Sequence, residues 1–181
     1  DPDIFDSEGL PKLNHVPESA LVVGGGAIGC EFASIFNALG IRVTVVNSGE
    51  HLLGNMDSEL SDLLRKTFEK QGMRIVLGTG VDTVDRVNGK LQTTLKTGEV
   101  LRPGIALIAT GRLVSTEGLG LEAAGVKLNP RGMVEVDNHF QTSVEGVYAV
   151  GDVIGPSLAS ISAEQGRVAA CHAFGLGFKV K

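Results

Sequence analysis

Apolar positions between residues 19 and 77 alternate between short unbroken runs and runs with helical spacing. Residues 20–23 are continuously apolar, which is typical of a parallel strand covered on both faces. From residue 28 to residue 39, apolar side chains recur at a helical period, and Gly40 ends this predicted helix. Residues 41–46 are rich in β-branched side chains and predict a second strand.

The same alternation continues through a second helix and a third strand. Asp57 can cap a helix whose predicted buried face carries Leu60, Leu63, Leu64 and Phe68, and which ends at Gly72. Residues 74–77 predict the third strand. Strands that alternate with helices imply a parallel sheet with right-handed crossovers, so the pattern predicts an α/β fold of the Rossmann-like type.

The pattern then changes to an antiparallel one. Residues 81–87 and 90–96 flank Asn88-Gly89, which predicts a hairpin because both turn residues tolerate a positive φ. Thr97-Gly98 turns the chain again, and residues 105–108 return as a buried strand. The expected fold class is therefore a Rossmann-like parallel sheet with an inserted antiparallel meander, arranged as three β/β/α layers.

The two ends of the chain show weaker patterns. Residues 1–18 hold three prolines without periodicity and are interpreted as a linker, which leaves 19–111 as the nucleotide-binding domain. Residues 113–145 are irregular and rich in turn signals, whereas 147–150 predict another buried strand. Ser157 then opens a predicted amphipathic helix with Leu158, Ile161 and Val168 on its apolar face.

Composition and charge exclude several classes of function. The net charge is −5 and no basic run occurs, which argues against nucleic acid and against an anionic membrane surface. No apolar stretch is long enough to span a bilayer. Cys30 and Cys171 lie far apart and the four histidines lack metal-ligand spacing, so we expect no disulfide framework, no metal site and a cytoplasmic location. The chain does not begin with Met, so we expect a piece of a longer protein.

The strongest chemical signal is a glycine loop between the first predicted strand and helix. Gly24 permits a tight turn, Gly26 lets the backbone approach a pyrophosphate, and Gly29 lets helix and strand pack closely. Free N–H groups and the helix dipole would then meet the phosphates. The alternative is a glycine-rich turn without a ligand.

Asn47, at the end of the second predicted strand, occupies the position that selects between the two nicotinamide dinucleotides. An acid there binds the ribose 2′-hydroxyl of NAD, whereas a nearby Arg accepts the 2′-phosphate of NADP. Asn47 can bind a hydroxyl without repelling a phosphate, so we expect weak discrimination, with NAD somewhat favoured because Glu50 is close. The alternative is that Asn47 only caps a turn.

Three further residues allow two interpretations each. Glu31 is expected in the first turn of the helix, where it serves either the helix dipole or the nicotinamide end of the cofactor. Asp152, after the strand 147–150, is either a polyol contact or a turn former. Cys30 is interpreted as a packing residue rather than a nucleophile.

Taken together, the motifs resemble the FAD-dependent pyridine nucleotide-disulfide oxidoreductases. The segments that carry this resemblance are 24–33 (GGGAIGCEFA), 109–112 (ATGR) and 146–152 (GVYAVGD), and their order and spacing cover most of the chain. Within the family, the chain is most similar to members that transfer hydride between two nicotinamide dinucleotides, on the stretches 4–7, 46–48, 52–53 with 56–57, and 156–160 with 165–167.

The resemblance implies a role for each candidate site residue. NAD or NADP would bind through its pyrophosphate to Gly24, Gly26, Ala27, Ile28 and Gly29. Asn47 would meet the adenosine ribose, Val81 the adenine, and Glu31 the place where nicotinamide stacks on flavin. Ala109, Gly111 and Arg112 would close the NAD site, while Gly151, Asp152, Leu158 and Ala159 would contact FAD.

The resemblance also implies what lies outside this chain. Family members carry a separate FAD domain and an interface domain that makes a homodimer, so residues 112–181 are expected to be the C-terminal part of the FAD domain. The longer protein would pass hydride from NAD(P)H to FAD and on to a second nicotinamide, and no catalytic residue is expected here. The alternatives are dihydrolipoamide dehydrogenase or another disulfide reductase, and a non-catalytic NAD(H)-binding module.

Overall fold

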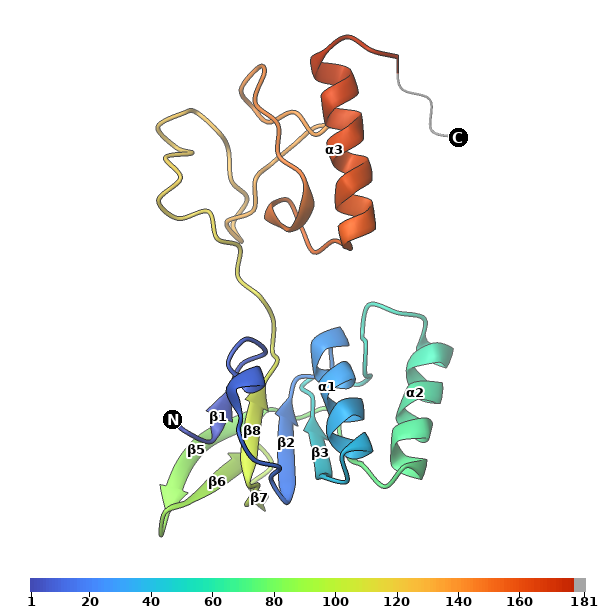
Figure 1. Ribbon diagram of the computed structural model, residues 1–181, viewed down its shortest axis with the longest axis vertical. Helices are drawn as coiled ribbons and strands as arrows, with labels where there is room; N and C mark the ends of the chain where they lie inside the picture. The colour runs from blue at the N-terminus through green and yellow to red at the C-terminus, as the bar shows by residue number, and fades with distance from the viewer. Residues whose placement is uncertain (178–181) are drawn as a thin grey trace. The chain divides into compact units, whose positions relative to one another are not determined.

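The computed structural model describes residues 1–177, which form two compact units (Figure 1). Unit 1 comprises residues 1–111, and unit 2 begins at Arg112. Among the described residues, no helix is long and apolar enough to cross a membrane, and no group of three or more His, Cys, Asp or Glu side chains converges as a metal site would require.

Unit 1 is built on a parallel sheet of five strands in the order β1-β8-β2-β3-β4. Val22 pairs with Val45 on one side and with Leu107 on the other, so β2 lies in the middle of the sheet. The parallel α/β fold predicted from the sequence is confirmed. The strands are β1 (Ile4–Phe5), β2 (Ser19–Val23), β3 (Arg42–Val46), β4 (Arg74–Val76) and β8 (Ile105–Ile108).

The two faces of this sheet bury different layers. Ala20 and Val22 belong to a core shared with the helices α1 (Ala27–Ala38) and α2 (Ser58–Lys70), which includes Phe36 and Phe68. The alternate residues of β2 face a second core, which contains side chains of the antiparallel sheet. Three β/β/α layers result, as the sequence predicts.

The antiparallel sheet contains β5 (Val81–Val87), β6 (Lys90–Leu95) and β7 (Val100–Leu101). The predicted hairpin is confirmed, because Asn88 and Gly89 adopt φ values of 52° and 77° at its tip. This sheet follows β4 and precedes β8, so it is an insertion between two strands of the parallel sheet.

Residues 1–18, predicted to be a linker, are part of unit 1. Ile4 and Phe5 form β1 on the edge of the sheet beside β8, and the 3-10 helix η1 (Leu10–Lys12) buries Leu10. Arg86 of the hairpin donates hydrogen bonds to the carboxylates of Asp1 and Asp3, which fixes the start of the chain. A strand of two residues is too short to produce a periodic pattern, so β1 could not be predicted from the sequence.

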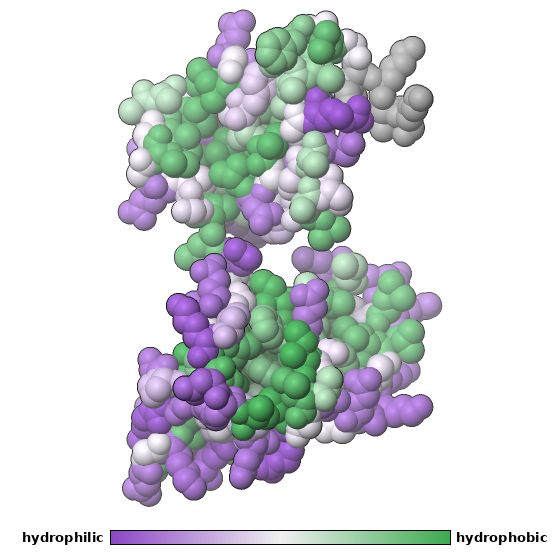
Figure 2. Space-filling view, viewed as in Figure 1, coloured by the Kyte–Doolittle hydropathy of each residue, from purple (hydrophilic) through white to green (hydrophobic). Residues whose placement is uncertain are grey.

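The predicted buried faces of the helices are only partly correct. In α2, Phe68 is buried, but Leu60 and Leu63 are 61% and 62% exposed. In α1, Ile35 and Leu39 are exposed and line a largely apolar groove of about 430 Å³ against the N-terminal segment. Figure 2 shows apolar surface gathered over this part of unit 1. Helical periodicity identifies an apolar face without saying what covers it.

Unit 2 has little regular structure before its final helix. The elements are η2 (Gly151–Val153) and α3 (Ala159–Ala173), and single antiparallel bridges such as Gln141 to Tyr148 stabilise the preceding loops. The strand predicted at 147–150 is not formed, because only Tyr148 has a bridge partner among the described residues. Helix α3 begins two residues after Ser157, and Leu158 and Ile161, expected to be buried, are exposed.

Candidate dinucleotide-binding site

The candidate site lies where strand order reverses in the parallel sheet of unit 1. After β2 the chain continues to β3 on one side, whereas β8 lies on the other. The Gly24 amide donates to Val46 O over 2.8 Å, and the Ala109 amide donates to Val23 O over 2.7 Å. The carboxyl ends of β2, β3 and β8 therefore surround one crevice, which is the usual ligand position in an open α/β sheet.

Glycine is required at two positions of the loop because the backbone there is too close for a side chain. Gly24 has φ of 113°, and a Cβ on it would lie 2.3 Å from Ala109 O. A Cβ on Gly29 would lie 2.0 Å from Gly24 O. At Gly26, by contrast, φ is −76° and a Cβ would meet nothing within 4 Å. Gly26 is therefore not required by packing, and its surface is open to a ligand.

The first turn of α1 adds a favourable environment for an anion. Gly26 is the N-cap and offers no side-chain acceptor, and the first intrahelical bond runs from Cys30 N to Gly26 O. The amides of Ala27, Ile28 and Gly29 precede that bond, so the helix itself does not satisfy them. These amides and the positive end of the helix dipole can bind a pyrophosphate.

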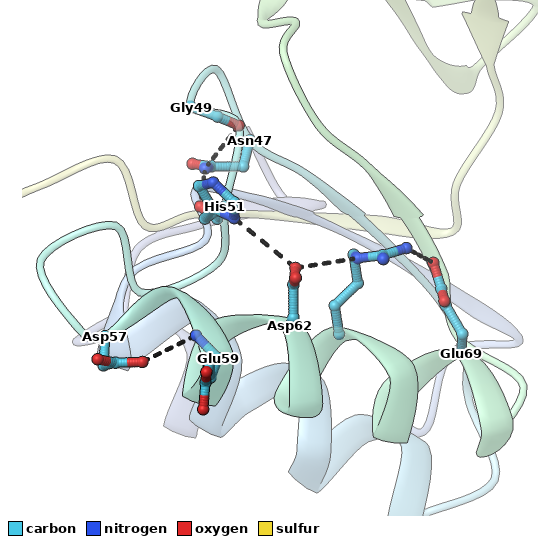
Figure 3. A network of polar contacts seen from close by, with 8 residues as sticks. Asn47, Gly49, His51, Asp57, Glu59, Asp62 and Glu69 are labelled. Carbon is cyan, nitrogen blue, oxygen red and sulfur yellow. Dashed lines mark hydrogen bonds and ion pairs between the residues drawn. The ribbon is translucent and has the colours of Figure 1, made fainter.

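Asn47 holds the glycine loop through its carboxamide. Its Oδ1 accepts from Gly25 N over 3.0 Å. Its Nδ2 donates to Gly49 O over 3.3 Å and to His51 O over 2.9 Å, as Figure 3 shows. Leu53 N donates to Gly25 O over 2.7 Å, so both polar groups of the Gly25 backbone are held by the segment that follows β3. Both N–H bonds of the Asn47 carboxamide are donated within the protein. Of the side-chain groups, only Oδ1 can therefore form one more hydrogen bond, as an acceptor.

A cavity of about 470 Å³ brings most of the predicted NAD(P) residues together. Of these, Gly24, Gly26, Asn47, Val81, Ala109 and Gly111 line it. Ser48, Gly80, Lys96 and Thr110 also line it; Thr110 belongs to the segment 109–112 that was expected to close the site, whereas Gly80 and Lys96 were not predicted. Lys96 directly follows β6 and enters the cavity wall through the antiparallel sheet, so only the three-dimensional fold reveals it.

Two residues of α1 can be compared with their sequence predictions. The position of Glu31 differs from its prediction, whereas Cys30 confirms its own. Glu31 is the fifth residue of the helix rather than part of its first turn, so it gains less from the helix dipole than expected. Burial, with a further effect of the Glu31 charge, raises the pKa of the Cys30 thiol to about 11. Cys30 also donates its S–H to Gly25 O, over 3.4 Å. Cys30 is therefore an inert packing residue, as predicted.

Unit 2 contains a second cavity, of about 420 Å³, lined by Arg112 and Asp152 together with Leu113, Ser115, Met133 and Pro156. One carboxylate oxygen of Asp152 accepts from Ser157 N over 2.9 Å, which fixes the segment that leads into α3. Gly151 has φ of 78° and donates to Gln165 Oε1. Leu158 is the N-cap of α3 and provides no side-chain acceptor, so the Ala159 amide begins a helix terminus without a protein cap.

The fold and the site of unit 1 define a dinucleotide-binding α/β domain with an inserted antiparallel sheet. The chain belongs to the pyridine nucleotide-disulphide oxidoreductase family, whose model matches residues 2–166.

The relatives agree with this membership. The chain is 41% identical over 168 residues to the soluble pyridine nucleotide transhydrogenase of Photorhabdus laumondii, and 42% identical over 170 residues to that of Pseudomonas fluorescens. These matches cover 92% and 93% of this chain but only 36% and 37% of the relatives. The chain thus spans little more than a third of their length.

Two solved structures show the same fold. LpdA from Mycobacterium tuberculosis matches with a TM-score of 0.89 at 34% identity, over 98% of this chain and 39% of that protein. The flavoprotein disulfide reductase RclA from Escherichia coli matches with a TM-score of 0.89 at 31% identity, over 98% of this chain and 41% of its own. The Rossmann-like α/β fold expected from the sequence is confirmed.

Proposed function

We propose that unit 1 binds a nicotinamide dinucleotide and that the whole protein is a flavin-dependent soluble pyridine nucleotide transhydrogenase. The observation that carries the proposal is the open surface of Gly26 beside the free amides of the first turn of α1. The pyrophosphate lies against this surface, and the adenosine half extends past Asn47 toward Val81. The similarity to the transhydrogenases over more than nine-tenths of this chain supports the assignment of the reaction.

We further propose that unit 2 contributes to an FAD site. Within residues 1–177, only one carboxylate oxygen of Asp152 accepts a hydrogen bond, and the other would accept from a hydroxyl of the ribityl chain. The free amides at the start of α3 would donate to the flavin ring, and the cavity beside Asp152 would hold the polyol. Bound FAD supplies the hydride acceptor and donor, whereas this chain binds and orients the two cofactors.

A disulfide reductase is the second candidate, because the flavoprotein disulfide reductase RclA has the same fold with a TM-score of 0.89. Hydride transfer from NADPH to an NAD analogue, measured beside lipoamide reduction on the whole protein, separates the two. Disulfide reduction without transhydrogenation would exclude the first candidate.

The resemblance also supports a cytoplasmic location and a homodimer. Sedimentation equilibrium of the whole protein tests the homodimer.

The replacement Gly26→Ala tests the nucleotide site itself. A methyl group at Gly26 meets no protein atom within 4 Å, so the fold is retained, but the methyl occupies the surface that the pyrophosphate approaches. We expect NADH affinity, measured by calorimetry on the whole protein, to fall about tenfold or more, which corresponds to about 1.4 kcal/mol. Gly54→Ala, which also meets nothing within 4 Å and lies outside the cavity, is the matched control. Equal affinity in the two variants would refute the site.

A further inference from the structure

We propose that Lys96 is the residue that recognises the 2′-phosphate of NADP(H) in this site. The inference rests on the proposed function, since it assigns part of the same dinucleotide pocket. Lys96 is the one charged side chain among the residues that line the cavity around the glycine loop, all of them in the described part of unit 1. The other lining residues are apolar, glycine, or the neutral polar Asn47, Ser48 and Thr110.

The order of the strands places Lys96 on the adenosine side of the pocket. The glycine loop follows β2, Asn47 and Ser48 follow the neighbouring strand β3, and the segment 77–81 follows β4, next in the sheet. A dinucleotide whose pyrophosphate lies on the glycine loop places its adenosine ribose over the end of β3. The next protein surface beyond that ribose is the segment that contains Gly80, and Lys96 lies against it.

The stem of Lys96 is held in this direction. Its backbone N–H donates to Gly80 O over 2.9 Å, and its Cε lies 3.7 Å from the position that a Cβ on Gly80 would take. Gly80 itself lines the cavity, so the aliphatic stem crosses the cavity wall next to it. No ion pair of Lys96 occurs among the described residues, so its ammonium is available to an anion.

Asn47 does not supply the donor that a 2′-phosphate needs, and Glu50, whose carboxylate lies beside Gly78, cannot supply one either. Both donors of the Asn47 carboxamide are engaged by Gly49 O and His51 O, so Asn47 has no N–H to offer a phosphate. Its remaining acceptor favours a hydroxyl rather than a phosphate oxygen. A cation near the 2′-position therefore has to come from another segment, and the antiparallel sheet provides it.

The test compares four probes on the whole protein: NADPH, NADH, 2′,5′-ADP and 5′-AMP. We expect Lys96→Met, which keeps the unbranched stem and removes the charge, to weaken NADPH and 2′,5′-ADP binding about tenfold or more. NADH and 5′-AMP affinities should stay within about twofold, since neither carries a 2′-phosphate. Lys96→Arg should restore most of the affinity for NADPH.

Lys90→Met, at the opposite end of β6 and outside this cavity, is the matched control and should change none of the four affinities. Equal weakening of NADH and NADPH by Lys96→Met would mean that Lys96 contacts the pyrophosphate, and unchanged binding would mean that it contacts no ligand. Either result overturns the inference while the dinucleotide site stands. If the unmodified protein binds none of the four probes, the proposed function itself fails.

Discussion

Replacement of Asn47 by Asp separates two interpretations of the position after β3. In many dinucleotide-binding domains an acid there binds the ribose of NAD, and by that rule Asn47→Asp should improve NADH binding. The structure predicts the opposite, because the Nδ2 group donates to Gly49 O and His51 O. An Asp would lose both bonds and place a carboxylate oxygen against two carbonyl oxygens.

The magnitude follows from the bonds involved. Two lost hydrogen bonds cost about 0.5–1.5 kcal/mol each, or about 1–3 kcal/mol in total. The bond from Gly25 N to Oδ1 remains and becomes charge-assisted, which offsets about 1 kcal/mol. The difference is about 0–2 kcal/mol, and repulsion between the new carboxylate and the carbonyl oxygens of Gly49 and His51 adds to it. We therefore expect a net loss of about 1–2 kcal/mol in the free energy of unfolding of unit 1, which corresponds to a fall in Tm of roughly 5–10 °C for a domain of this size.

The assay combines thermal unfolding with NADH titration of the whole protein. Asn88→Asp is the matched control: Asn88 lies at the exposed hairpin tip, makes no side-chain hydrogen bond in the described structure, and occupies a turn position that Asp also tolerates. We expect Asn47→Asp to lower both Tm and NADH affinity, because the Gly25 backbone loses part of its support. Tighter NADH binding at an unchanged Tm would refute the assignment of Asn47 as a loop-holding residue.

Three further predictions concern the glycine loop and α1. Gly24→Ala should cost unit 1 about 3 kcal/mol or more, because its Cβ would lie 2.3 Å from Ala109 O at a φ of 113°; an unchanged denaturation midpoint would contradict this. Cys30, with a pKa of about 11, should resist alkylation at pH 8, where about one thiol in a thousand is ionised, while the less buried Cys171 is labelled. Peptide mapping by mass spectrometry checks this order. Because folding raises the Cys30 pKa from 9.0 to about 11, its contribution to stability is complete below pH 9 and is lost as the pH rises toward 11.

The elements with local causes were predicted from the sequence. The Asn88-Gly89 hairpin depends on two residues that tolerate positive φ, and both adopt it. Asp57 was expected to cap α2, and its side chain accepts from Glu59 N. The glycine loop was identified because its turn and the close approach of Gly29 to Gly24 O act within the motif, whereas the approach of Gly24 to Ala109 O depends on a distant strand.

Features that depend on distant partners could not be predicted. The segment 147–150 has the composition of a strand, but a strand also needs a neighbour that forms a ladder, and a single bridge at Tyr148 is not one. Leu60 is apolar and correctly spaced on α2, yet the core contacts only one side of that helix. Lys96 lies 67 residues after Gly29, and only the return of the antiparallel sheet toward the glycine loop brings it to the cavity.

The orientation of Asn47 shows why the residue type after β3 is a poor guide to cofactor preference. The rule that an acid there selects NAD assumes that the side chain points to the ribose. In this chain the segment after β3 turns back so that Gly49 O and His51 O converge on the same side chain, and this arrangement requires a donor. An amide is therefore favoured by the loop before any ligand is considered, and an acid is disfavoured for the same reason. If the site binds as we propose, cofactor preference depends on the wall opposite the ribose, to which Lys96 of the inserted antiparallel sheet contributes.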